Sequence, residues 1–133
     1  MRLRIEHGEY RVDTIALLNS GYETLRPEIL LPRRIVDELK LTLQPSASIV
    51  KEYMLPGEST VQLTRIVGVV KVSVVEDDRI VGPIDADVAV SEGAEEPLIG
   101  DKLAGRLCIS VLDFAEGIWC FRDELGRRER GSY

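Results

Sequence analysis

The sequence predicts one all-β domain. The chain has 133 residues, of which 44% are apolar, and a chain of this length can bury the core of a single domain. Val occurs 14 times and Ile 11 times, and 15 of these 25 residues lie within residues 49–90. Since β-branched side chains pack well on a pleated sheet and lose rotamer freedom in a helix, this concentration favours strands.

The N-terminal elements follow from alternation and from turn residues. Leu3 and Ile5 alternate with charged residues, which predicts a short strand, and a second strand is predicted over residues 10–18. This strand ends at residues 19–21, Asn-Ser-Gly, a turn by composition. A short helix is predicted from Pro32, because proline suits the first helical position and an apolar face follows it. That face consists of Ile35, Val36 and Leu39.

The middle of the chain reads as a series of strands. They are predicted over residues 49–55, 60–67, 69–75 and 80–90. The first two flank residues 56–59, Pro-Gly-Glu-Ser, which have the composition of a hairpin tip. Within the last strand, Gly82 and Pro83 predict a bulge or an edge position, because proline cannot donate to a sheet ladder.

The C-terminal part begins with a short apolar run, Leu98-Ile99, that stops at Gly100. A brief helix over residues 101–107 is predicted next, followed by a hairpin of residues 109–114 and 118–122. Residues 122–133 are rich in charge and are predicted to form a solvated polar tail. The predicted domain therefore spans residues 1–121.

The charge balance argues against several classes of function. Lys and Arg number 17 against 23 Asp and Glu, a net charge of −6, whereas nucleic-acid and anionic-membrane binders usually carry a basic face. No run of 18 apolar residues is present to span a bilayer, and the N-terminus lacks the apolar run of a secretory signal. We therefore expect a soluble cytoplasmic protein with neither a nucleic-acid nor a membrane partner.

Cysteine and histidine are scarce. Cys108 and Cys120 are too few for a secreted disulfide scaffold and are predicted to be buried small hydrophobes. His7 is the single histidine and is predicted to be a solvated turn residue. Two cysteines and one histidine at these spacings do not supply a zinc site, and no glycine-rich phosphate loop is present. We expect neither a metal nor a cofactor.

Two pieces far apart in the chain stand out together. Residues 16–21 read Ala-Leu-Leu-Asn-Ser-Gly, and residues 98–103 read Leu-Ile-Gly-Asp-Lys-Leu, followed by Leu-Asp-Phe at 112–114. A glycine-tipped hairpin lies between them. Over about residues 3–121, this order of features resembles the retropepsin-like aspartic proteases, in which an apolar strand delivers an Asp-Thr/Ser-Gly loop. In that family a flap hairpin follows, and an apolar-apolar-glycine turn and a short helix come near the end.

This resemblance implies a closed acid-protease-like barrel, with the short helix after its Leu-Ile-Gly turn, that forms a homodimer. Two identical loops meet at the dimer axis, and each contributes one carboxylate. Carboxylates this close cannot both ionise, so they share one proton. The ionised member activates a water that attacks the peptide carbonyl, and the protonated member donates to the carbonyl oxygen. In this scheme Ser20 supplies a hydroxyl that bonds across the dimer, and Gly21 lets the two loops approach closely.

The resemblance also implies a flap and a supporting turn. The flap closes over a peptide or protein substrate and excludes water, and its tip holds Pro56 and Gly57. Tyr53 and Met54 precede the tip and either line a substrate pocket or pack on the sheet. The turn of Leu98, Ile99 and Gly100 packs beneath the catalytic loop.

Asn19 stands where the family has its catalytic Asp. A carboxamide can neither take a proton from water near neutral pH nor share one with its mate. This form is therefore predicted to be inactive as an endopeptidase, although the similar shape of Asn preserves the loop and the dimer. Three interpretations stay open: an engineered inactivation, a natural loss that leaves a dimeric peptide-binding or structural module, and an ordinary Asx turn.

Other carboxylates are weaker candidates for the missing acid. Asp13 is not followed by the required glycine and is predicted to face outward on a strand. Asp101 is predicted to cap the short helix, and Asp113 to have a polar or turn role. Glu23 either binds a substrate group near the cleft or is solvated. Trp119 is predicted to lie either in the core or at the dimer interface.

Overall fold

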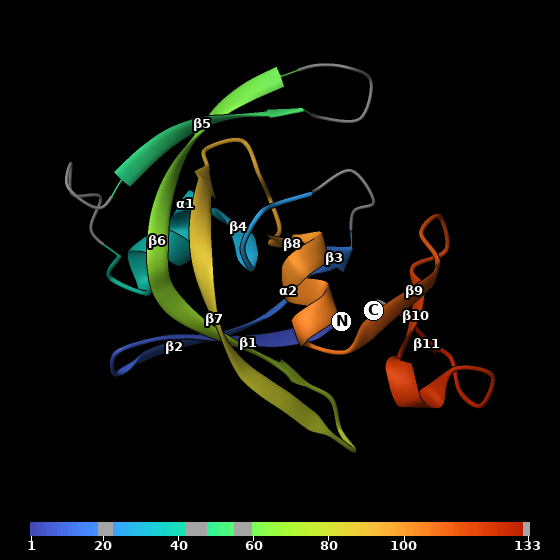
Figure 1. Ribbon diagram of the computed structural model, residues 1–133. Helices are drawn as coiled ribbons and strands as arrows, with labels where there is room; N and C mark the ends of the chain where they lie inside the picture. The colour runs from blue at the N-terminus through green and yellow to red at the C-terminus, as the bar shows by residue number, and fades with distance from the viewer. Residues whose placement is uncertain (19–22, 42–47, 55–59, 132–133) are drawn as a thin grey trace.

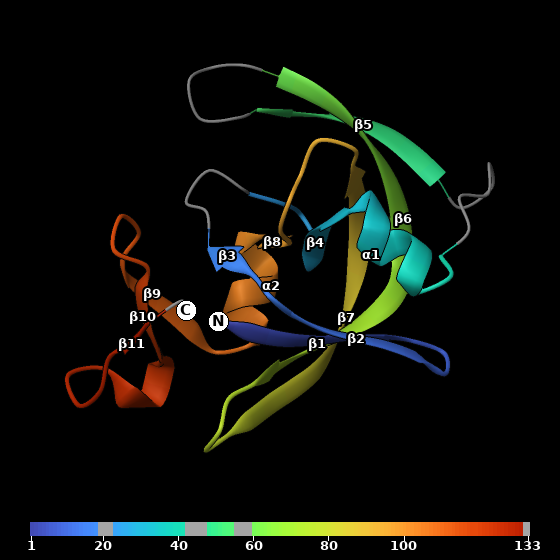
Figure 2. The ribbon, with the colours of Figure 1, turned by 180° about the vertical axis from the view of Figure 1, so that it is seen from behind.

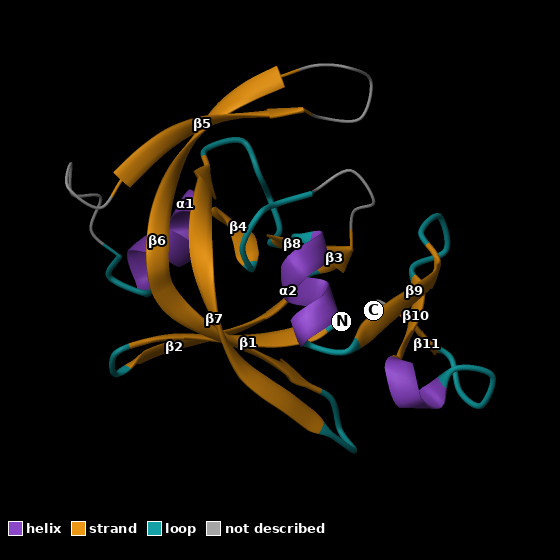
Figure 3. Ribbon diagram, viewed as in Figure 1, coloured by secondary structure: helices purple, strands orange, loops and turns teal. Residues whose placement is uncertain are grey.

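The computed structural model describes residues 1–18, 23–41, 48–54 and 60–131 (Figure 1). Strands dominate this part of the chain, as the all-β prediction requires (Figure 3). The strands are β1 (Arg2–His7), β2 (Tyr10–Ile15), β3 (Leu17–Leu18), β4 (Glu28–Pro32), β5 (Ser48–Met54), β6 (Thr60–Val75), β7 (Ile80–Ser91), β8 (Leu98–Ile99), β9 (Ile109–Asp113), β10 (Ile118–Phe121) and β11 (Arg130–Gly131). The helices are α1 (Arg33–Glu38) and α2 (Asp101–Arg106), and η1 (Arg122–Glu124) is a 3₁₀ turn.

Eight strands form one strongly curled sheet, a half-barrel in outline (Figures 1 and 2). Hydrogen-bonded neighbours follow the order β2-β1-β6-β7-β4-β8-β3, and β5 pairs with β6 outside this path. The two ends of the path, β2 and β3, are consecutive pieces of chain separated only by Ala16. The amide of Ala16 donates to the Met1 carbonyl at 2.9 Å, so the β1–β2 pairing continues to the point where the chain changes neighbours.

The core lies inside the curl. It combines side chains from β1, β4, β6 and β7 with those of both helices and of the C-terminal strands. Its most buried members include Leu3, Ile5, Ile29, Leu31, Ile35, Leu39, Val72, Val88, Ile99, Leu103, Trp119 and Phe121. On β6 and β7, the buried β-branched side chains that the structure describes are Val70, Val72, Val74, Val88 and Val90, and they pack on the pleated surface inside the curl.

Several predicted elements are present with shifted bounds. The helix after Pro32 is confirmed, and Pro32 is its N-cap. The two strands predicted over residues 60–75 form one strand, β6, whose pairing with β7 is irregular between Ile66 and Val70. An irregularity also occurs opposite Gly82, as predicted. A Cβ at Gly82 would lie 2.8 Å from the Val72 carbonyl oxygen and φ there is +122°, so only glycine fits.

The strand β4 has no counterpart among the predicted elements. All five of its residues are buried, and it runs parallel to β7 and antiparallel to β8. A central strand covered on both faces loses the alternation of apolar and polar residues that marks a half-buried strand. Two prolines, Pro27 and Pro32, bound the run and further obscure it.

Two side chains correct the expectations about reactive residues. His7 is half-buried rather than solvated, and its Nδ1 donates to the Leu39 carbonyl at 2.8 Å. Neither cysteine forms a disulfide. Cys120 is buried as predicted, and burial raises the pKa of its thiol. Cys108 is exposed, with φ of 62°, because it follows the end of α2 where the chain reverses.

The segment predicted as a solvated tail is largely ordered against the body of the protein. Over residues 122–131 the chain forms η1 and then β11, which pairs with β10. Arg130 is 6% exposed and Glu124 is 8% exposed. Two charged side chains this deeply buried require each other, since an unpaired buried charge is strongly unfavourable. Sequence composition alone gave no sign of the pairing.

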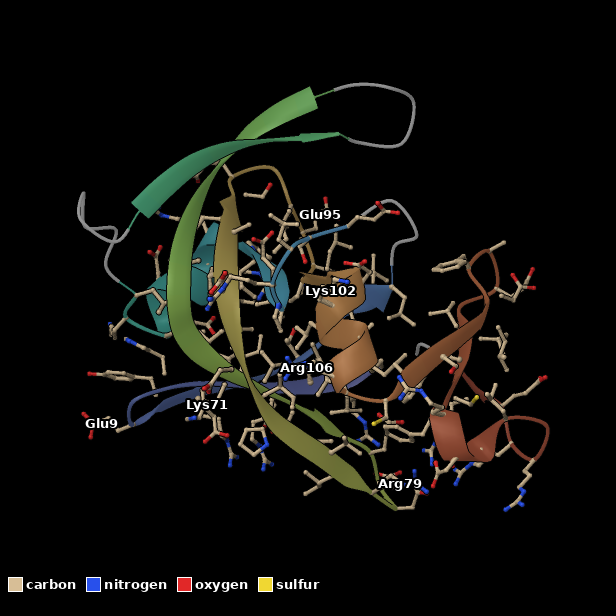
Figure 4. All side chains as sticks on the ribbon, viewed as in Figure 1. Glu9, Lys71, Arg79, Glu95, Lys102 and Arg106 are labelled. Atoms are coloured by element: carbon tan, nitrogen blue, oxygen red, sulfur yellow. The ribbon has the colours of Figure 1, made fainter. Side chains whose placement is uncertain are left out.

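Arg130 is the centre of an ion network that joins this segment to the β6–β7 turn. Its Nε and Nη2 donate to the two carboxylate oxygens of Glu124, each at 2.8 Å. Its Nη1 and Nη2 donate to Asp78 at 2.9 and 2.8 Å. The guanidinium also lies 4.9 Å from the centroid of the Phe121 ring. Arg79, at the tip of the same turn, donates to Asp123 at 2.7 Å (Figure 4).

The network sets the titration of its carboxyl groups. The hydrogen bonds from Arg130 lower the pKa of Glu124 to about 2 and hold the pKa of Asp78 well below its usual range. The same bonds raise the pKa of Arg130. A carboxyl group whose pKa is lower in the folded state stabilises the fold above its unfolded pKa, and this contribution is lost as the pH falls through the folded value.

We expect Arg130→Ala to lower the free energy of unfolding by about 3 kcal/mol at neutral pH, because it leaves Glu124 buried without its partner. The parent protein should lose stability as the pH falls from about 4.5 towards 2, the interval between the ordinary and the folded pKa of Glu124. In Arg130→Ala this part of the pH dependence should be flat. Urea denaturation from pH 7 to pH 2 measures both effects, with exposed Arg127→Ala as the control. An equal slope in both variants would contradict the role of Arg130.

Candidate functional site

The structure brings the two distant sequence motifs into contact. Leu17 and Leu18 of β3 pair in parallel with Leu98 and Ile99 of β8. The Leu17 amide also donates to the Pro97 carbonyl at 2.9 Å. The strand that leads into residues 19–22 is therefore hydrogen-bonded to the first two residues of the Leu-Ile-Gly segment.

Of the other predicted site residues, the structure describes only the two that precede the flap tip, Tyr53 and Met54. Asn19, Ser20 and Gly21 lie outside the described residues, as do Pro56 and Gly57 at the predicted flap tip. Tyr53 and Met54 end β5, where their backbones pair with Val61 and Thr60. The β5–β6 hairpin predicted around residues 56–59 is thus present in its two strands.

The strand β8 is held on both sides. Its second neighbour is β4, through the antiparallel pairs of Ile29 with Ile99 and of Leu30 with Leu98. Beyond β8, the Gly100 amide donates to the Glu28 carbonyl at 3.0 Å. Two residues of β8 thus join the chain before residues 19–22 to the strand that follows them.

Gly100 is required for space rather than for backbone conformation. Its φ of −74° suits any residue. A Cβ added there would lie 3.2 Å from the Glu28 carbonyl oxygen and 3.2 Å from Oγ1 of Thr24. The carbonyl belongs to a buried strand and cannot move aside, so the close packing of β4, Thr24 and α2 depends on this glycine.

The chain leaves residues 19–22 through a segment with its own hydrogen bonds. The Thr24 amide donates to Oδ1 of Asp101 at 3.0 Å, and the Thr24 hydroxyl donates to the Arg26 carbonyl at 2.6 Å. The Arg26 guanidinium donates to both oxygens of Asp87, at 3.1 and 3.4 Å. The Asp87 side chain is 1% exposed, whereas that of Arg26 is 59% exposed. These contacts fix residues 24–28 against β7 and α2.

The sequence interpretation did not identify Thr24, Arg26 or Asp87, and it gave Asp101 a different role. Asp101 is the first residue of α2 rather than its cap, since Gly100 occupies the N-cap position without a side-chain hydrogen bond. A recognisable signal existed for Asp101, because it directly follows the Leu-Ile-Gly segment. The contact of Arg26 with Asp87 depends on the pairing of β4 with β7, and the contact of Thr24 depends on α2, neither of which local sequence reveals.

Two side chains beside the site face solvent. Glu23 is exposed, which matches the solvated alternative for this residue. Leu25 is 90% exposed, although its neighbours Thr24 and Arg26 are both hydrogen-bonded. Asp13 is also exposed, in an ion pair with Arg4 at 3.2 Å, which confirms its outward position on β2.

The C-terminal three-stranded sheet lies beside β3 (Figures 1 and 2). A groove of about 100 Å³ separates the two. It is lined by Leu17, Leu18, Val111, Phe114, Ala115, Glu116 and Gly117. Phe114 is 51% exposed and Leu112 is 44% exposed.

Trp119, in contrast, is fully buried against Phe121, and its indole nitrogen donates to the Gly131 carbonyl at 3.1 Å, so the structure places it in the core.

The described residues offer few alternatives for chemistry. Within them, no three His, Cys, Asp or Glu side chains are grouped so that they could hold a metal ion. The Nδ1 atom of His7 donates to a carbonyl, so that atom is not available as a base. No helix in the same ranges has the length and apolarity needed to cross a bilayer.

No family model and no curated protein matches this chain.

We expect Gly100→Ala to lower the free energy of unfolding by about 1–3 kcal/mol, because its methyl group overpacks the junction of β4 and α2. Gly105 provides a matched control within α2. A Cβ there meets nothing within 4 Å, so Gly105→Ala should stabilise the protein by about 0.5–1 kcal/mol through helix propensity. Thermal and urea denaturation of both variants measure the difference. Equal stabilities of the two variants would contradict this account of Gly100.

Proposed function

We propose that this chain is one subunit of a homodimeric retropepsin-like aspartic endopeptidase, in a form that Asn19 makes inactive. The observation that carries the proposal is the pairing of β3 with β8 and of β8 with β4. These contacts hold both sides of residues 19–22 on the Leu-Ile-Gly segment, the arrangement that the family resemblance implies for a catalytic loop.

The proposal includes a closed barrel. Its support is the path of the curled sheet, whose two ends β2 and β3 are joined through Ala16. It also includes a cytoplasmic location, favoured by two cysteines that form no disulfide.

The proposed chemistry needs two chains, because each supplies one loop. With Asp at position 19, two carboxylates at the dimer axis would share a proton and titrate as a pair. One would take a proton from the attacking water, and the other would donate to the peptide carbonyl oxygen. With Asn in both chains there is no base, and a bound peptide stays intact. A dimeric peptide-binding module is the second candidate, favoured by Asn19 itself.

Restoring the carboxylate tests the proposal. The Asn19→Asp variant should cleave an unfolded protein at acidic to neutral pH, whereas the parent should not. Product formation is followed by mass spectrometry. Asn19→Asp combined with Asp13→Asn should cleave as well as Asn19→Asp alone, because Asp13 is a surface residue paired with Arg4. If neither the parent nor Asn19→Asp cleaves, the endopeptidase proposal is wrong. Peptide that the parent then binds and protects would favour the binding module.

The homodimer is tested separately. We expect the protein to be dimeric at micromolar concentration and Phe114→Glu to shift it towards monomer, because a charge would replace exposed apolar surface beside the β3 groove. Leu125→Glu is the control, since Leu125 is also 51% exposed but follows η1. Sedimentation velocity distinguishes the species. A monomeric parent would contradict both candidate functions, and a dimer unaffected by Phe114→Glu would exclude this surface from the interface.

A further inference from the structure

The carboxylate of Asp101 connects two parts of the chain that are far apart in sequence. Its Oδ1 accepts the amide of Thr24 at 3.0 Å and the amide of Lys102 at 2.8 Å. Thr24 is the second residue after residues 19–22, and Lys102 lies in the first turn of α2 (Figure 4). One oxygen atom therefore ties the exit of the proposed catalytic loop to the start of the helix.

The entrance to the loop is held differently. There, β3 forms a parallel ladder with β8, and the Leu17 amide donates to the Pro97 carbonyl. These are backbone hydrogen bonds, which most substitutions leave in place. At the exit, the amide of Thr24 is bonded to a side chain. The position of the exit thus depends on the identity of residue 101 in a way that the position of the entrance does not.

We infer that Asp101 is a positioning residue, which sets the placement of the loop's reacting group through the Thr24 amide. The inference rests on the proposed function. Without the acceptor, the Thr24 amide must turn towards water, and the exit of the loop moves with it. Displacing a reacting group by about 1 Å can cost on the order of 100-fold in rate. Since no contact to the peptide is removed, the change should reduce kcat rather than raise KM.

Three substitutions separate geometry from charge. Asp101→Asn keeps an oxygen at the same place and removes the charge. Asp101→Glu keeps the charge but adds a methylene, so its oxygens no longer meet the Thr24 amide in the same position. Asp101→Ala removes both. A positioning role predicts that Asn preserves function and that Glu and Ala do not.

Asp85 provides a control. Its Oδ1 accepts a hydrogen bond from Nζ of Lys71 at 2.8 Å, and its side chain is 74% exposed, so Asp85→Ala also deletes one carboxylate and one hydrogen bond. It does so between β6 and β7, outside the contacts that fix Thr24 and outside the groove beside β3.

The kinetic experiment uses the Asn19→Asp protein as parent and an internally quenched peptide designed around a cleavage site mapped with that parent. We expect Asp101→Ala and Asp101→Glu to lower kcat by about 10- to 100-fold with KM within about 3-fold. Asp101→Asn should stay within about 3-fold of the parent, and Asp85→Ala should match it. Loss of activity in Asp101→Asn with retention in Asp101→Glu would show a charge effect and overturn the inference.

Amide hydrogen exchange in the original Asn19 chain gives a readout that does not need catalysis. The Thr24 amide should exchange slowly in the parent and in Asp101→Asn, and faster in Asp101→Ala, with the amides of β6 unchanged. Equal Thr24 exchange in all variants overturns the inference even if activity differs. An active Asn19→Asp enzyme whose Asp101→Ala derivative keeps its kcat also overturns it and leaves the proposed function standing. An inactive Asn19→Asp protein instead overturns the proposed function, and the catalytic role of Asp101 with it.

Discussion

The hydrogen bonding of β8 between β3 and β4 is the constraint on which the rest of this structure depends. Only two residues, Leu98 and Ile99, form the strand. Their pairing with β3 holds the chain that enters residues 19–22, and their pairing with β4 holds the strand that follows. The two residues that follow β8 support this junction. Gly100 leaves room for close packing against Glu28 and Thr24, and the carboxylate of Asp101 accepts a hydrogen bond from the Thr24 amide. A short strand thus organises a large part of the candidate site.

A second set of interactions fixes the C-terminal sheet to the β6–β7 turn. Arg130 is buried between Glu124 and Asp78, and it contacts the faces of the aromatic rings of Trp119 and Phe121. The desolvation of this guanidinium is offset by four hydrogen bonds to two carboxylates. The same hydrogen bonds lower the pKa of both carboxyl groups, so we expect the network to remain ionised in mildly acidic solution.

The parts of the fold that the sequence predicts are those with local signals. Alternation and β-branched content indicate β5, β6 and β7, and proline indicates the start of α1. The strand β4 escapes prediction because burial on both faces removes its alternation. The burial of the charged side chains of Arg130 and Glu124 could not be predicted, because each is stabilised by a partner that tertiary structure brings near.

The same distinction applies to the candidate site. The association of residues 17–18 with residues 98–99 was implied by the resemblance to retropepsin-like proteases, and the pairing of β3 with β8 brings the two segments together. The sequence places Asp101 directly after the Leu-Ile-Gly segment. Its contact with Thr24, 77 positions away in sequence, could not be predicted, because it depends on how the chain before β4 packs against α2. The bond from Arg26 to Asp87 likewise depends on the parallel pairing of β4 with β7.

The position of β8 in the chain has a consequence for folding. The contacts that hold residues 19–22 are made with residues 97–101, so they close one of the longest loops in the protein, and loop closure of this kind is entropically costly until other contacts share the cost. During synthesis, the β1–β2 hairpin can form early, but the loop that follows it stays unsupported until the ribosome has released residue 101. The growing chain therefore cannot complete the candidate site before most strands of the large sheet have been synthesised.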